Sequence, residues 1–177
     1  MKRILPLVLI GLLTALVGCG RENGQPLSIH GGKNNVAVDK TKYMLAQEPK
    51  AAQGVVQVRE KSKDGDAVVV VGRIGGEKKS PFVNGLAAFT IVDTAAIPCN
   101  EIEGDNCPTP WDYCCDPDLA KKKVLVKFVD EQGQTLGFDA EKGLELQPLQ
   151  TVVVQGKVSR SADGGISILA QGVFVRP

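Results

Sequence analysis

Residues 67–76 read AVVVVGRIGG, and residues 151–159 read TVVVQGKVS. Both stretches are rich in valine, whose branched side chain favours an extended, pleated backbone. Each also carries a glycine after its valines, at Gly72 and at Gly156. A glycine inside a strand permits the bulge that lets one strand bend sharply and serve two sheet faces. The two stretches therefore predict the bent strands of a small barrel.

Three further segments have the composition of strands: LAAFTIVD at 86–93, VLVKFVD at 124–130 and ISILAQGVFV at 166–175. A short helix is expected at 139–144, between the third and fourth strands. The resulting order, three strands, a helix and two strands, resembles the OB-fold over about the last 110 residues. The resemblance implies a mostly β protein with a five-stranded OB-like small barrel and one or two short helices. A β-sandwich is the alternative.

The segment before the first strand has two interpretations. Pro49 could occupy the first position of a helix that ends near 61–65, because proline is tolerated there. Alternatively, residues 55–59 could pair with the next strand as a hairpin through the Asp64-Gly65 turn. We favour the helix.

The N-terminus has the pattern of an export signal. Lys2 and Arg3 precede an apolar run at 4–17, which is typical of a secretory leader and too short for a spanning helix. The run ends in Leu16-Val17-Gly18-Cys19, which resembles the lipobox of bacterial lipoproteins. The resemblance implies a signal peptide at 1–18, lipidation of Cys19, and a membrane-anchored lipoprotein of the cell envelope that faces the periplasm or the exterior. It leaves the choice of membrane open.

Between the lipid anchor and the barrel, residues 19–48 are polar, rich in glycine and asparagine, and without periodicity. This composition predicts a flexible tether, followed by the barrel domain at 49–177. The single histidine, His30, lies in the tether. A histidine-based catalytic triad in the domain is thereby excluded. No phosphate-binding loop or zinc-histidine motif is present either, so the sequence predicts a protein that is not an enzyme.

The charge balance limits the partners. The formal net charge is +1, and without the leader there are 19 basic residues against 20 acidic ones. A near-neutral protein has no electrostatic reason to bind phosphate backbones, so nucleic acid is not a predicted partner. The predicted partners are the membrane, through the lipid anchor, and an unknown small-molecule or protein ligand.

The connection at 94–123 is far longer than the usual loop of about 4–6 residues. It holds every cysteine except Cys19: Cys99, Cys107, Cys114 and Cys115. In an oxidising compartment an even number of cysteines predicts disulfides. A bond between the adjacent Cys114 and Cys115 would be strained, so Cys99 and Cys107 are each expected to bond one member of that pair. The alternative is a metal site that holds zinc or copper through four thiolates. The disulfide interpretation requires no cofactor.

The same loop contains CPTPWDYCC at 107–115, which resembles a loop of uncharacterised exported bacterial proteins and implies no activity. Trp111 and Tyr113 are amphipathic side chains of the kind that anchor ligands or partners, although Trp111 could equally pack over the barrel end. Together with Asp112 they are the candidate contact residues. The sequence therefore predicts a lipid-anchored extracytoplasmic binding or envelope-organising module with a disulfide-stapled loop, and a metal-handling protein as the alternative.

Overall fold

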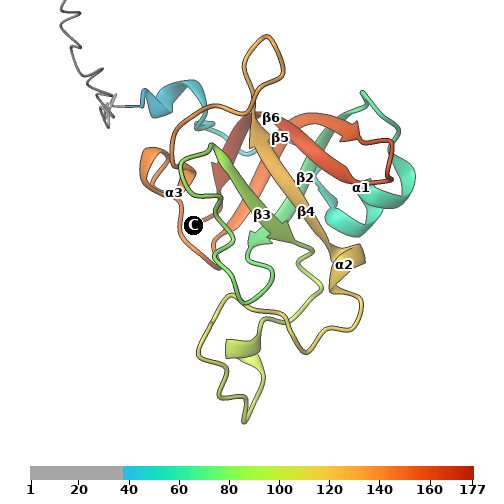
Figure 1. The fold of residues 1–177 in the computed structure, drawn as a ribbon, viewed down its shortest axis with the longest axis vertical. Helices are drawn as coiled ribbons and strands as arrows, with labels where there is room; N and C mark the ends of the chain where they lie inside the picture. Colours follow the sequence, from blue (N-terminus) through green and yellow to red (C-terminus); the bar gives the residue numbers. More distant parts are fainter. Residues whose placement is uncertain (1–37) are drawn as a thin grey trace, which may run out of the picture. The chain divides into compact units, whose positions relative to one another are not determined.

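The computed structural model describes residues 38–177, which are shown in colour in Figure 1. The predicted signal peptide at 1–18, the lipidated Cys19 and most of the tether lie outside these residues and stay predictions. Within the described range, no helix has the length and apolar character required to cross a membrane.

Five strands close into a barrel: β2 (Ala67–Ile74), β3 (Ala88–Val92), β4 (Lys123–Phe128), β5 (Thr151–Arg160) and β6 (Ile166–Val175). Their order is β2-β3-β4-β6-β5, and β5 pairs with β2 to complete the closure. All these pairs are antiparallel except β4 with β6, which is parallel (Figure 1). The predicted five-stranded OB-like barrel is confirmed, and the β-sandwich alternative is wrong because one sheet closes on itself.

Alternation along the strands fills the barrel interior. In β2 and β4 every second residue is buried, as expected when successive side chains point to opposite faces of a sheet. The buried set from these two strands and β3 includes Val68, Val70, Ile74, Phe89, Ile91, Val124, Val126 and Phe128. Inward-facing aliphatic and phenylalanine side chains therefore form one core inside the barrel.

Gly156 produces the predicted bend in β5. The register of β5 against β6 shifts between Gln155 and Gly156, which marks a bulge. A Cβ atom at position 156 would lie 2.4 Å from the carbonyl oxygen of Leu169, so only glycine allows this approach. Because Gly156 also pairs with Val68 of β2, the bend occurs where β5 joins both of its neighbours.

The helix α1 (Val55–Lys61) confirms the helical interpretation of the segment before β2, and the hairpin alternative is wrong. The helix begins at Val55 rather than at Pro49, after a short strand β1 (Gln53–Gly54) that pairs in parallel with β2. The start is set by a distant residue, because the carboxylate of Asp93 accepts a hydrogen bond from the Val56 N–H at 2.9 Å. The predicted short helix before β5 is present as α3 (Ala140–Gly143).

Residues 38–48, which we assigned to the tether, pack on the barrel. They include the short 3₁₀ helix η1 (Lys40–Lys42), and the Leu45 N–H donates to the carbonyl of Val173 in β6 at 2.8 Å. The ring of Tyr43 contacts that of Phe128, with 5.1 Å between centroids. Tyr43 and Leu45 thus contact the barrel although they precede residue 49, the predicted start of the domain. The composition of residues 38–48 did not predict this packing, because only a few apolar residues in an otherwise polar segment make the contacts.

Candidate metal centre

The loop between β3 and β4 contains two short helices, η2 (Cys99–Glu101) and α2 (Leu119–Lys122). Backbone hydrogen bonds hold its middle against the end of β2: the Gly76 N–H donates to Trp111, and the Tyr113 N–H donates to Gly76, both at 3.0 Å. The Cys99 N–H donates to the carbonyl of Asp112 at 2.8 Å. These bonds place η2 beside residues 112–115, so cysteines distant in sequence become neighbours.

Tyr113 anchors the loop in the barrel end. Its ring is fully buried in a second apolar cluster with Val92, Ala96 and Leu119. Gly75 makes room for the ring, because a Cβ there would lie 2.7 Å from Tyr113 Cε2. Burial raises the pKa of Tyr113 to about 12. We expected Tyr113 at the surface as a contact for a ligand or partner, and this is wrong because its ring belongs to the core.

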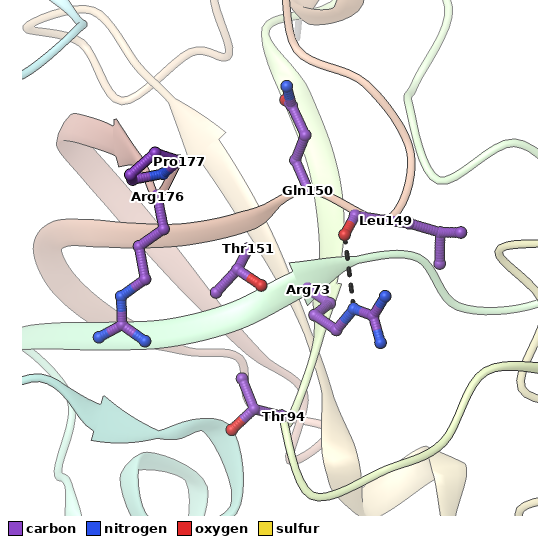
Figure 2. A pocket seen from close by; sticks show the side chains of 7 residues that line it. All are labelled: Arg73, Thr94, Leu149, Gln150, Thr151, Arg176 and Pro177. Carbon is purple, nitrogen blue, oxygen red and sulfur yellow. Dashed lines mark hydrogen bonds between the residues drawn. The ribbon is translucent and has the colours of Figure 1, made fainter. Parts of the chain in front are cut away.

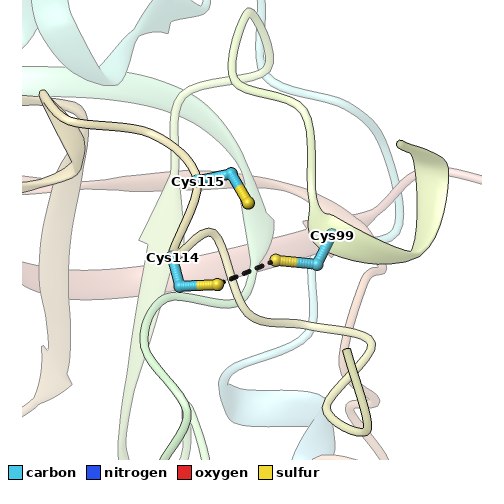
Figure 3. A group of neighbouring side chains, drawn as sticks. All are labelled: Cys99, Cys114 and Cys115. Atoms are coloured by element: carbon cyan, nitrogen blue, oxygen red, sulfur yellow. Dashed lines mark hydrogen bonds between the residues drawn. The ribbon is translucent and has the colours of Figure 1, made fainter. Parts of the chain in front are cut away.

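The sulfurs of Cys99, Cys114 and Cys115 lie within 4.8 Å of one another, and the first two are 3.4 Å apart (Figure 3). Cys99 is buried, whereas Cys114 and Cys115 are exposed. All four loop cysteines are thiols, so the structure does not contain the expected pairing of Cys99 and Cys107 with Cys114 and Cys115. The loop is held by backbone bonds and by Tyr113 instead of by disulfides.

A second group of ligand atoms shares Cys114 with the first. The sulfurs of Cys107 and Cys114 and a carboxylate oxygen of Asp112 also lie within 4.8 Å of one another. Asp105 orders this side of the loop: its carboxylate accepts from the Cys107 N–H at 2.8 Å and from the Cys115 thiol at 3.7 Å. The sulfurs of Cys99, Cys107 and Cys115 and the carboxylate of Asp112 therefore surround the sulfur of Cys114.

Burial controls the protonation of the innermost thiol. It raises the pKa of Cys99, and the contact with Cys114 raises it further. A thiolate is the form that binds metal, and a nearby cation is what favours the thiolate at a buried position. The cluster thus has the donor atoms of a thiophilic metal site and one ligand shielded from solvent.

Trp111 is the candidate contact residue that stays near the surface. It is half-buried, and its indole N–H donates to the carbonyl of Lys79 at 3.2 Å. This bond ties the loop to the connection between β2 and β3. Trp111 thus has a packing role, and its use as a contact for a ligand or partner stays a prediction. Asp112, the third candidate, is 4% exposed and faces the cysteines rather than solvent.

Sequence reasoning missed a shallow cavity of about 560 Å³ near the start of β5. Figure 2 shows its lining residues: Arg73, Thr94, Leu149, Gln150, Thr151, Arg176 and Pro177. Both arginines already have acidic partners, because Arg73 pairs with Glu101 and Arg176 with Glu48, each at 2.7 Å. The lining residues are far apart in the sequence, so no local sequence pattern could have predicted this cavity. Arg73 also connects this cavity to the cysteine loop, since Glu101 ends η2.

No protein-family model matches this sequence, and no curated protein matches it. Among solved structures, the chain is similar to the hypothetical protein ygiW from E. coli, with 13% identity and a TM-score of 0.38. The similarity covers 71% of this chain and 90% of that one. It carries no information on function, so function has to be inferred from the site itself.

Proposed function

We propose that this chain is a lipid-anchored protein of the cell envelope that binds a thiophilic metal ion, zinc or cuprous copper, through its cysteine loop. The observation that carries the proposal is the gathering of the loop sulfurs around Cys114. Two separate disulfides would divide the four cysteines into two distinct pairs. A metal site instead requires that the donor atoms converge on one point.

The distances between the loop sulfurs are close to those around a tetrahedral zinc ion. Tetrahedral zinc with four thiolates places neighbouring sulfurs about 3.8 Å apart, as follows from a Zn–S bond of about 2.3 Å. The Cys99 and Cys114 sulfurs are 3.4 Å apart, and the spread within each group is at most 4.8 Å. These distances are within about 1 Å of the spacing that a tetrahedral thiolate site requires.

The exposure of the ligands favours a protein that exchanges metal. Cys99 lies at the buried base of the cluster, whereas Cys114 and Cys115 are exposed at its rim. A purely structural site is usually closed on all sides. Here an incoming ion or a partner protein can reach two of the thiolates directly. We therefore infer that the domain carries or buffers metal at the membrane and has no catalytic activity of its own.

Loss of Cys114 is expected to weaken zinc binding at least about 100-fold, because even second-shell changes at metal sites cost about 10–100-fold. Cys114→Ser should show this in competition with a chromogenic chelator, using full-length protein purified in detergent under reducing conditions. Cys19→Ser removes a cysteine outside the loop and should leave the affinity unchanged. Equal affinity of wild type and Cys114→Ser would contradict the metal site.

A disulfide-stapled binding module is the second candidate function, and the 3.4 Å separation of the Cys99 and Cys114 sulfurs favours it. An exported protein meets an oxidising compartment, in which neighbouring thiols tend to bond. Intact mass after alkylation, with and without reduction, separates the two functions. Four cysteines that react with the alkylating reagent only after reduction, together with no bound metal, in protein isolated from the envelope would support the stapled module.

The proposed anchor can be tested independently of the metal. Cys19→Ser should abolish labelling by a fatty-acid analogue and release the protein from the membrane fraction, because no polybasic segment is available to hold it there. Fractionation of cells that express wild type and variant measures this. A variant that stays in the membrane pellet without lipid would show that another segment supplies the attachment.

A further inference from the structure

We infer that the cluster holds two divalent ions that share the thiolate of Cys114, an inference that rests on the proposed metal-binding function. The donor atoms form two overlapping groups, Cys99 with Cys114 and Cys115, and Cys107 with Cys114 and Asp112. Cys114 is the one residue common to both. A single ion bound by one group would leave the remaining donors of the other group without metal. A thiolate sulfur has enough lone pairs to bridge two ions, so Cys114 can serve both groups.

The position of Asp112 adds an oxygen donor to the second group. Asp112 is 4% exposed. Within residues 38–177 no ion pair engages its carboxylate, and its oxygens are not among the fully buried atoms that lack a partner, so they keep contact with solvent. The other buried aspartate, Asp93, is 7% exposed and accepts hydrogen bonds from the N–H groups of Val56 and Ala95 at 2.9 and 3.0 Å. The carboxylate of Asp112 is therefore available as an oxygen ligand beside the sulfurs of Cys107 and Cys114.

Charge balance also favours two ions over one. When all four thiols lose their protons to bound metal, they and Asp112 carry five negative charges, of which one divalent ion leaves three uncompensated and two ions leave one. Nearby basic side chains are engaged elsewhere. Lys122 pairs with Asp116 and Lys121 with Asp118, each at 2.8 Å, and Arg73 pairs with Glu101 at 2.7 Å. Within the described chain, no lysine or arginine forms an ion pair with Asp112.

The two positions differ in chemistry. The first has only sulfur ligands, one of them the buried Cys99. The second has two sulfurs and the Asp112 oxygen, which makes it harder and less suited to cuprous copper. Zinc accepts thiolate and carboxylate ligands alike, so it can occupy both. We therefore assign the pair of sites to zinc, with Cys115 specific to the first position and Asp112 and Cys107 specific to the second.

Native mass spectrometry of the full-length, reduced protein in detergent, titrated with zinc sulfate, tests this assignment. Wild type should bind two zinc ions. Asp112→Asn keeps the shape of the side chain but removes the charge and should bind one. Asp118→Asn, an exposed carboxylate of the same loop paired only with Lys121, should still bind two. Cys107→Ser and Cys115→Ser should each bind one ion, and Cys114→Ser should bind neither tightly.

The outcomes separate the two proposals. Wild type that binds no zinc overturns the metal-binding function and this inference together. Wild type that binds one zinc, unchanged by Asp112→Asn, overturns the second site and leaves the proposed function intact. Two ions in both wild type and Asp112→Asn would remove Asp112 from the ligand set. Thermal unfolding of the metal-free proteins controls for misfolding, and Asp112→Asn should then unfold close to the temperature of wild type because the change keeps the shape of the side chain.

Discussion

Replacing Tyr113 with alanine is expected to lower the free energy of unfolding by about 3–5 kcal/mol, the usual cost of truncating a buried aromatic side chain. The ring lies entirely inside the cluster with Val92, Ala96 and Leu119, and it is the main apolar attachment of the loop to the barrel. Urea unfolding monitored by circular dichroism measures the change. The same variant should also bind zinc less tightly, because the backbone that positions Cys114 is then no longer fixed.

Tyr113→Phe is the matched control, and its expected result has the opposite sign. The buried hydroxyl is the one side-chain polar atom within residues 38–177 that lacks solvent contact and a hydrogen-bond partner. Removing such a group relieves an unmet desolvation cost, so stability should be unchanged or rise by up to about 1 kcal/mol. A loss of more than 1 kcal/mol would show that the hydroxyl has a partner, such as a bound water molecule.

Gly156→Ala is expected to lower the free energy of unfolding by about 3 kcal/mol, at the upper end of the range for overpacking. The new methyl group would lie 2.4 Å from the Leu169 carbonyl oxygen and 3.0 Å from Ala170 Cα. Both atoms belong to the backbone of β6 and cannot turn aside as a flexible side chain can. The β5–β6 ladder must therefore open at the bulge, which also disturbs the pairing of Gly156 with Val68.

Gly137→Ala provides the comparison for this effect. No atom lies within 4 Å of the position that its Cβ would occupy, and its φ is outside the left-handed region. Its stability should therefore stay within about 0.5 kcal/mol of wild type. Both variants can be measured by the same urea titration. If Gly156→Ala were as stable as Gly137→Ala, the bulge would not be a constraint on barrel closure.

The strands were predictable because their pattern is local. Valine runs and alternation mark β2 and β5, and the glycine that follows the valines in β5 indicates the bulge later observed at Gly156. The start of α1 was not predictable in the same way. It depends on the carboxylate of Asp93, which lies 37 residues from Val56 in the sequence. Only the folded chain brings this carboxylate to the first turn of the helix.

The loop illustrates the same limit at the candidate site. Sequence identified the four cysteines and Asp112 but could not determine their arrangement, because spacing alone does not fix the path of a long loop. Trp111 and Tyr113 are chemically alike and two residues apart, yet only Tyr113 enters the core. The difference arises from Gly75, which leaves space for one ring at the end of β2.

The position of β6 affects how fast the chain can fold. It is the last strand, yet it pairs with β4 and β5, and its Val173 bonds the backbone near Leu45, close to the start of the described chain. Contacts between such distant segments slow folding, because a large loop must close before any of them forms. Because the chain is synthesised from its N-terminus, it cannot complete the barrel until residues 166–175 have been made, so the closing contacts of the barrel form last.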